Sequence, residues 1–151
     1  MRLVIQRVSR ASVSVDAKVV GQIGSGLLVL VGVAPGDNEA DVAWLARKLV
    51  GLRVFDDVAT GQMARSVADI SGGILLVSQF TLLASTKKGS KPSFSRAAAP
   101  GEAEASYQDF VAAVAGELGR AVETGIFGAA MQVELCNDGP VTLIIDSRLR
   151  E

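Results

Sequence analysis

Histidine is absent from this chain of 151 residues, and cysteine occurs once, at Cys136. Without imidazole, serine–histidine and cysteine–histidine nucleophile pairs are impossible within the chain. The same shortage argues against a zinc site built from nitrogen and sulfur ligands. A single cysteine also forbids an internal disulfide, which agrees with a cytosolic protein.

Long apolar runs and glycine-rich phosphate loops are missing as well. No stretch is long enough to span a bilayer, and the apolar part of the segment 1–7 is too short for a signal peptide. No Walker or dinucleotide loop occurs, and no Asp/Glu cluster has the spacing of a magnesium or calcium loop. The sequence therefore predicts a cytoplasmic protein without a membrane segment, metal or cofactor.

What is present indicates one folded domain. Hydrophobic residues make up 49% of the chain and charged residues 21%, which is typical of a globular protein. We expect a single domain over residues 1–151, with residues 146–151 as a charged, frayed tail. The net charge of −1 is not that of a protein that grips long stretches of nucleic acid.

One segment departs from this balance. Residues 86–96 carry four cations and one aromatic side chain without any acid; they are Lys87, Lys88, Lys91, Arg96 and Phe94. The segment has two interpretations, which are a solvated surface loop and a local seat for phosphates and a stacked base.

Periodicity predicts an α/β architecture. Alternating or continuous apolar residues indicate strands at 11–16, 27–31, 51–55, 74–80, 131–135 and 141–145, with turn regions at 21–26 and 34–38 and a loop over 56–73. Apolar residues at helical spacing indicate two helices; the stripes are Val42, Leu45, Ala46 and Leu49, then Tyr107, Phe110, Val111, Val114, Leu118, Ala121 and Val122. Hairpins at both ends of the chain favour a mixed sheet.

Two short blocks carry the functional information. Ser78-Gln79-Phe80-Thr81-Leu82 places polar side chains and backbone N–H groups where a buried strand ends. Asn137-Asp138-Gly139-Pro140-Val141-Thr142 is read as a turn between two strands. With these blocks the chain resembles the D-aminoacyl-tRNA deacylase family, which removes D-amino acids from tRNA. The likeness covers nearly the whole chain and includes Ile5-Gln6-Arg7-Val8, Ala11-Ser12-Val13, Gly26-Leu27-Leu28-Val29-Leu30, Pro92-Ser93-Phe94 and Met131-Gln132-Val133.

The resemblance implies a fold and a site. The fold is a barrel-like or two-sheet core of mixed β-sheet with two main helices outside, and the protein is a homodimer with active sites at the interface. The catalytic block is Ser78, Gln79, Phe80 and Thr81. A cis peptide at Gly139-Pro140 enters the partner's pocket, where its carbonyls reject L-amino acids, and Arg7 holds this turn across the interface. Phe94 and Met131 contact the substrate, and Lys87, Lys88 and Lys91 contact the tRNA.

The chemistry implied suits a chain without histidine. The ester is already activated by the neighbouring ribose hydroxyl and by the α-ammonium group of the amino acid. Backbone N–H groups near Phe80 and Thr81 would hold the oxyanion, a contribution of about 3–4 kcal/mol per donor. Water would attack, assisted by the 2′-hydroxyl of the ribose. The competing scheme makes the Thr81 hydroxyl the nucleophile, but it needs a base, and none is adjacent in the sequence.

Each residue also has a purely structural interpretation. Ser78 and Thr81 can end a strand through hydroxyl-to-backbone bonds, Phe80 and Met131 can be core, Gly139-Pro140 can be a trans turn, and Arg7 can be a surface charge. Three functional classes therefore compete: a hydrolase of D-aminoacyl-tRNA and glycyl-tRNA, an inert module that binds RNA ends, and a small-molecule enzyme or structural dimer on the same fold.

Overall fold

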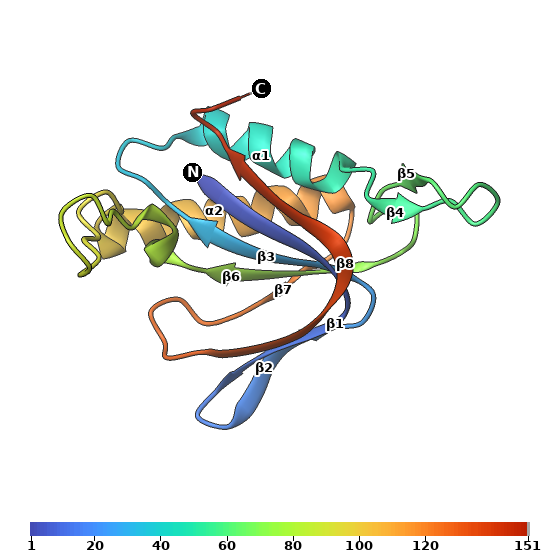
Figure 1. Cartoon of the computed structure of the whole chain (residues 1–151), viewed down its shortest axis with the longest axis horizontal. Coiled ribbons are helices and arrows are strands. Elements are labelled where there is room, and N and C mark those ends of the chain that lie inside the picture. The colour runs from blue at the N-terminus through green and yellow to red at the C-terminus, as the bar shows by residue number, and fades with distance from the viewer. Residues whose placement is uncertain (151) are drawn as a thin grey trace.

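A computed structural model describes residues 1–150, and its centre is a sheet that curls on itself (Figure 1). The long strand β1 (Arg2–Val15) pairs along its length with β8 (Gln132–Asp146). On its other side, β1 pairs first with β3 (Gly26–Gly32) and then with β2 (Lys18–Ile23), all antiparallel. Because β1 pairs with β8 on one side and with β3 and β2 on the other, the sheet forms a nearly closed, barrel-like core. This confirms the predicted fold class.

Parallel strands complete the mixed sheet. Strand β3 is followed in the sheet by β6 (Gly73–Ser78) and β7 (Glu123–Thr124), both parallel to their neighbours. Parallel neighbours need crossover connections, and these contain α1 (Glu39–Gly51) and α2 (Pro100–Leu118). A small second sheet, β4 (Phe55–Asp56) with β5 (Met63–Arg65), projects beside α1 (Figure 1).

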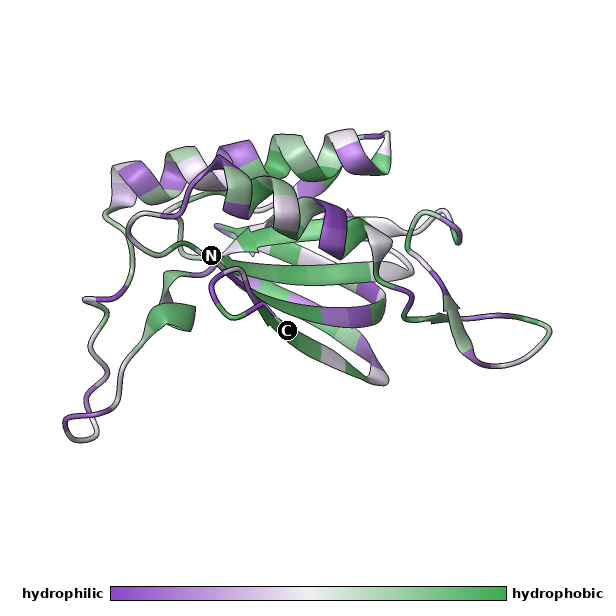
Figure 2. Cartoon of the chain, turned by 90° about the horizontal axis from the view of Figure 1, so that it is seen from above, coloured by the Kyte–Doolittle hydropathy of each residue, from purple (hydrophilic) through white to green (hydrophobic). Residues whose placement is uncertain are grey.

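The central strands are buried on both faces. One apolar cluster fills the space between the sheet and both helices, and a second lies inside the curl. Figure 2 shows the hydrophobic strands beneath helices that alternate between polar and apolar residues. The Asn38 side chain accepts hydrogen bonds from two N–H groups at the start of α1, and the Asp41 side chain accepts one from the Asn38 N–H, so the two residues cap the helix.

Several predicted boundaries are wrong. The region 21–26 was expected to turn, but Gly21 lies in β2, where a Cβ would sit 2.6 Å from the Thr124 carbonyl oxygen. This glycine therefore serves close packing of β2 on β7. The segment 51–55 was expected to be a strand, but it contains the end of α1 and only the first residue of β4.

The second helix and the last strand also differ from expectation. The helix α2 ends at Leu118 because Gly119 has a φ of 77°, so Ala121 and Val122 lie beyond it. The two C-terminal strand segments do not form a hairpin. They run in one direction as β8, and both halves pair with β1. Residues 138–141 form a bulge in β8 opposite the single residue Arg7.

The end of the chain is packed as far as it is described. Ser147 is buried, and its N–H donates to the Met1 carbonyl oxygen. Arg150 stacks over the Trp44 ring and lies 3.6 Å from Asp41. The expectation of a frayed tail therefore does not describe residues 146–150, while Glu151 lies outside the described residues.

Candidate active site

The Ser78–Leu82 block lies where the parallel strands β3 and β6 end. Ser78 is the last residue of β6 and pairs with Val31 of β3. The Gln79 N–H then donates to the Val31 carbonyl oxygen at 2.8 Å, and the chain turns into the short 3₁₀ helix η1 (Phe80–Leu83). The predicted strand 74–80 is therefore two residues too long. The carboxyl ends of parallel strands are a common place for ligand sites.

A glycine allows η1 to pack against the sheet. A Cβ at Gly32 would lie 2.5 Å from Leu83 Cδ2, 3.0 Å from Leu82 Cβ and 3.2 Å from the Gln79 carbonyl oxygen. Only hydrogen fits at this position. The N–H groups of Phe80 and Thr81 open η1, and the first N–H groups of a helix have no intrahelical acceptor.

A cavity of about 640 Å³ lies beside η1. Of the residues that the family resemblance assigns to catalysis or substrate contact, Ser78, Gln79, Phe80, Phe94 and Met131 line this cavity. Thr81 is not among the described residues that line it. Its inner wall is apolar and is lined by residues that sequence reasoning did not assign; these are Val31, Val33, Val77, Ala97, Ala98, Ala99, Pro100, Ala103, Tyr107, Phe127, Gly128, Ala129 and Val133. The cavity therefore combines an apolar floor with a polar edge, as small-molecule sites do.

Two exposed phenylalanines line this cavity. Phe80 and Phe94 make an edge-to-face pair with ring centroids 5.1 Å apart, and they are 55% and 40% exposed. The interpretation of Phe80 as ordinary core is therefore wrong. Met131 packs against the inner cluster and also lines the cavity, so its position fits both a core residue and a substrate contact.

Among the described residues that line the cavity, the polar side chains include no strong base. Gln79 Nε2 donates to Thr81 Oγ1 at 2.5 Å. The Tyr107 hydroxyl donates to the Leu76 carbonyl oxygen, and burial raises the pKa of Tyr107 to about 12. Tyr107 therefore stays protonated at neutral pH and acts as a donor.

Arg7 holds the bulge that contains Gly139-Pro140. Its guanidinium donates to the Asp138 carbonyl oxygen at 3.1 Å, to the Gly139 carbonyl oxygen at 3.4 Å and to the Val54 carbonyl oxygen at 2.6 Å. It also pairs with the carboxylates of Asp138 and Asp56. Arg7 is only 6% exposed, so it is not a surface charge. It contacts the bulge of its own chain, whereas the expected contact crossed a subunit interface.

Asp138, Gly139 and Pro140 of the bulge are exposed, whereas Val141 is buried. The peptide bond before Pro140 is cis, which confirms that prediction. Of the described residues, those that line the cavity include neither Gly139 nor Pro140. The Asn137 side chain donates to the carbonyl oxygens of Arg7 and Val141 and closes the base of the bulge. A Cβ at Gly139 would meet only Asn137 Oδ1, at an ordinary 3.7 Å.

The basic segment forms an exposed loop next to the cavity. Ser85 and Ser93 exchange backbone hydrogen bonds at its base, directly before Phe94. Lys87, Lys88 and Lys91 are all exposed between these two serines. The three lysines therefore lie on the loop that leads directly to Phe94.

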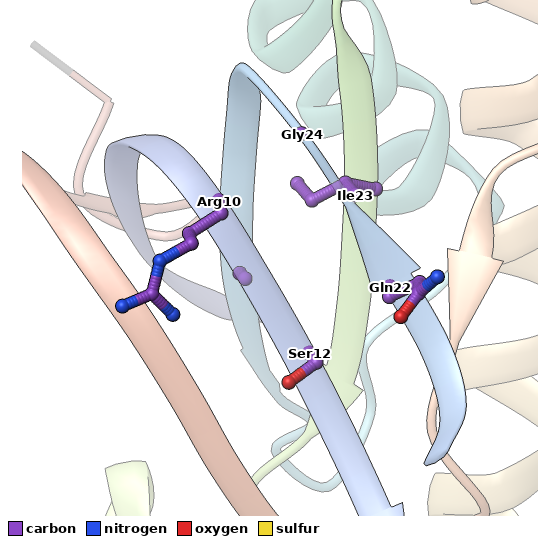
Figure 3. A pocket seen from close by; sticks show the side chains of 6 residues that line it. Arg10, Ser12, Gln22, Ile23 and Gly24 are labelled. Carbon is purple, nitrogen blue, oxygen red and sulfur yellow. The ribbon is translucent and has the colours of Figure 1, made fainter.

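A second cavity of about 440 Å³ lies on β1 and β2 (Figure 3). Figure 3 shows that the Arg10 side chain reaches from β1 toward β8, away from Ser12 and Gln22. Because its polar groups do not converge, this cavity is a weaker candidate than the one beside η1.

The family is decided by comparison with known proteins. The model of the D-Tyr-tRNA(Tyr) deacylase family matches residues 4–146. The chain belongs to this family. A D-aminoacyl-tRNA deacylase of Opitutus terrae is 59% identical, and one of Flavobacterium psychrophilum is 54% identical, each over 100% of both chains. The resemblance seen in the sequence is therefore confirmed for the whole deacylase domain.

Solved structures agree with this fold. A structure named c-Myc DNA Unwinding Element Binding Protein has a TM-score of 0.89 and 40% identity, and the match covers 97% of this chain and 98% of that one. A probable eukaryotic D-amino acid tRNA deacylase has a TM-score of 0.82 at 18% identity over 95% and 97% of the two chains, which supports the fold alone. Within residues 1–150, no helix is long and apolar enough to cross a membrane. The same residues contain no group of three or more metal-ligating side chains of the His, Cys, Asp and Glu types.

Proposed function

We propose that this chain hydrolyses the ester bond of D-aminoacyl-tRNA, and of glycyl-tRNA, to free tRNA and amino acid in the cytoplasm. The observation that carries the proposal is the cavity beside η1, which joins Ser78, Gln79 and Phe80 to an apolar floor in a chain of the deacylase family. The terminal adenosine and the amino acid would occupy this cavity, with Phe94 and Met131 as further contacts.

Water is the nucleophile in this proposal. The N–H groups of Phe80 and Thr81 would stabilise the oxyanion, which is worth about 3–4 kcal/mol for one such donor. The Thr81 hydroxyl accepts from the Gln79 amide, and an amide is not a base at neutral pH. This contact disfavours Thr81 as the nucleophile, because that role needs a neighbouring base.

The gate against L-amino acids is the Gly139-Pro140 bulge of a second subunit. Two observations support a role in trans: the bulge is exposed, and it does not line the cavity of its own chain. Arg7 fixes the direction of the Asp138 and Gly139 carbonyl groups. A rigid backbone obstacle rejects an L side chain by a clash, whereas glycine has no side chain to clash. A homodimer follows from this arrangement.

One assay tests the activity. Purified protein is incubated with D-tyrosyl-tRNA and L-tyrosyl-tRNA, with and without a chelator. We expect hydrolysis of the D ester alone, unchanged by chelation. Equal hydrolysis rates for the two esters contradict the gate. Binding without hydrolysis points to an inert module that binds RNA ends. Activity that is lost on chelation and returns only with added zinc contradicts the water scheme.

A single substitution tests the gate. Gly139→Ala adds a methyl group that meets ordinary contacts in its own chain, so the melting temperature should change little. If the bulge enters a partner's pocket, this methyl group should lower hydrolysis of D-tyrosyl-tRNA. Native activity in this variant, together with a monomer in sedimentation, contradicts the role in trans.

A further inference from the structure

A third cavity, which is lined in part by Leu83 of η1, carries three arginines in its walls. It measures about 270 Å³, and its lining contains Arg2, Arg96 and Arg148 but only one carboxylate, that of Asp146. We propose that this arginine cavity binds phosphates of the single-stranded 3′ end of the RNA substrate. The inference rests on the proposed function, because it takes the terminal nucleoside to occupy the cavity beside η1.

The two cavities share one wall. Val33 and Ala97 line the larger cavity, while their chain neighbours Ala34 and Arg96 line the arginine cavity. Neighbouring Cα atoms are about 3.8 Å apart, and the Ala98 N–H bonds the Val33 carbonyl oxygen at 2.9 Å across this wall. The two cavities are therefore neighbours, separated by a single layer of backbone, and a strand would reach the arginines by passing over this layer.

Two of the arginines are held in place. Arg2 donates to the Asp146 carboxylate at 3.0 Å and to the Leu82 carbonyl oxygen at 2.9 Å. Arg148 donates to the Pro35 carbonyl oxygen, and its Nη2 lies 3.0 Å from Asp37 Oδ1 in a charge contact without hydrogen-bond geometry. Each guanidinium has five N–H donors, so both arginines keep donors that can point into the cavity.

The third arginine is free to bind a ligand. The Arg96 side chain is exposed, and within residues 1–150 it makes no hydrogen bond or ion pair. Arg96 also belongs to the basic segment that carries the three lysines. Fixed and free guanidinium groups around one small cavity match the planar, bidentate recognition of phosphate.

Binding of the trinucleotide CpCpA, compared with adenosine, tests the proposal. Arg96→Gln should weaken CpCpA binding about 5- to 20-fold and lower the salt slope by about 0.7, the value for one phosphate contact on a single strand. Adenosine has no phosphate, so its affinity should stay unchanged. The matched control is Arg47→Gln on α1, an exposed position with the same loss of charge. Equal behaviour of the two variants, or equal loss for adenosine and CpCpA, overturns the proposal.

Hydrolysis separates this proposal from the proposed function. For D-tyrosyl-tRNA, Arg96→Gln should raise KM and leave kcat unchanged, while D-tyrosyl-adenosine should be hydrolysed at the native rate. A lower kcat on both substrates overturns a phosphate role. If the native protein hydrolyses neither substrate, the proposed function is wrong, and the CpCpA comparison still decides whether the arginine cavity binds phosphate.

Discussion

A methyl group at Gly32 tests whether η1 must lie where it does. The added Cβ would approach Leu83 Cδ2 to 2.5 Å, Leu82 Cβ to 3.0 Å and the Gln79 carbonyl oxygen to 3.2 Å. Carbon atoms are in contact at about 3.5–4.0 Å. The Leu83 methyl group ends a flexible side chain and can rotate away. The other two atoms move only with η1, so we expect η1 to shift by several tenths of an ångström.

This shift has a cost in stability and a larger cost in rate. Overpacking of this kind costs about 1–3 kcal/mol, and each kcal/mol lowers the melting temperature by about 2–4 °C in a chain of this size. We therefore expect Gly32→Ala to melt about 2–12 °C lower. A misplacement of 1 Å can cost about 100-fold in rate, so a smaller shift of the Phe80 and Thr81 N–H groups should lower kcat by about tenfold.

The assay combines thermal unfolding with single-turnover hydrolysis of D-tyrosyl-tRNA. The matched control is Gly116→Ala, because Gly116 is exposed in α2 and a Cβ there meets nothing within 4 Å. This control should stabilise the helix by about 0.5–1 kcal/mol and leave the rate unchanged. A native kcat in Gly32→Ala, with a clearly lower melting temperature, would show that the chemistry does not depend on the position of η1.

Three further predictions concern other parts of the chain. Thr81→Ala should keep substantial activity because the backbone N–H survives, and an acyl-enzyme detected by mass spectrometry in the native protein contradicts this. Replacing Lys87, Lys88 and Lys91 with glutamine should weaken tRNA binding and flatten its salt dependence without lowering the melting temperature; an unchanged salt slope means a merely solvated loop. Burial opposes ionisation of Asp41, but hydrogen bonds from the Asn38 N–H and from Ser147, with two positive charges, hold the pKa of Asp41 below 3.8. This ionised carboxylate stabilises the fold above about pH 4 and loses its effect as the pH falls, so unfolding followed from pH 7 to 3 should be less pH-dependent in Asp41→Asn.

Local patterns predicted the strands and helices whose apolar residues form a continuous run or recur at a regular spacing. The continuous apolar run 27–31 lies within β3, and the stripe from Val42 to Leu49 lies within α1. The errors have a physical reason in each case. Gly21 marks a close approach of strands and not a turn, and Gly119 ends α2 although apolar residues continue at helical spacing. A single sequence does not show which of its glycines meet another backbone.

Local sequence patterns do not predict contacts between residues that are far apart in the chain. Residues 131–135 and 141–145 each read correctly as strand, but their joint pairing with β1 depends on residues more than 100 positions away. The turn expected between them is a bulge, because both halves of β8 find the same partner strand. The sequence pattern therefore predicted the two strand segments, and the family resemblance predicted the cis bond at Gly139-Pro140. Neither predicted that the chain continues through this bond as one strand with a bulge.

The contacts of Arg7 could not be predicted from its place in the sequence. Its place in the motif follows from the sequence, but its acceptors lie 47 positions away, at Val54, and 131 and 132 positions away, at Asp138 and Gly139. A buried guanidinium is tolerable only when hydrogen bonds and opposite charges satisfy it, and here two of the three carbonyl acceptors belong to the bulge itself. Removal of Arg7 would leave those carbonyls without their donor, so the same contacts that make its burial possible also fix the direction of the bulge. Backbone carbonyl groups held by Arg7 thus form a rigid polar surface in a protein that has no histidine side chain to supply one.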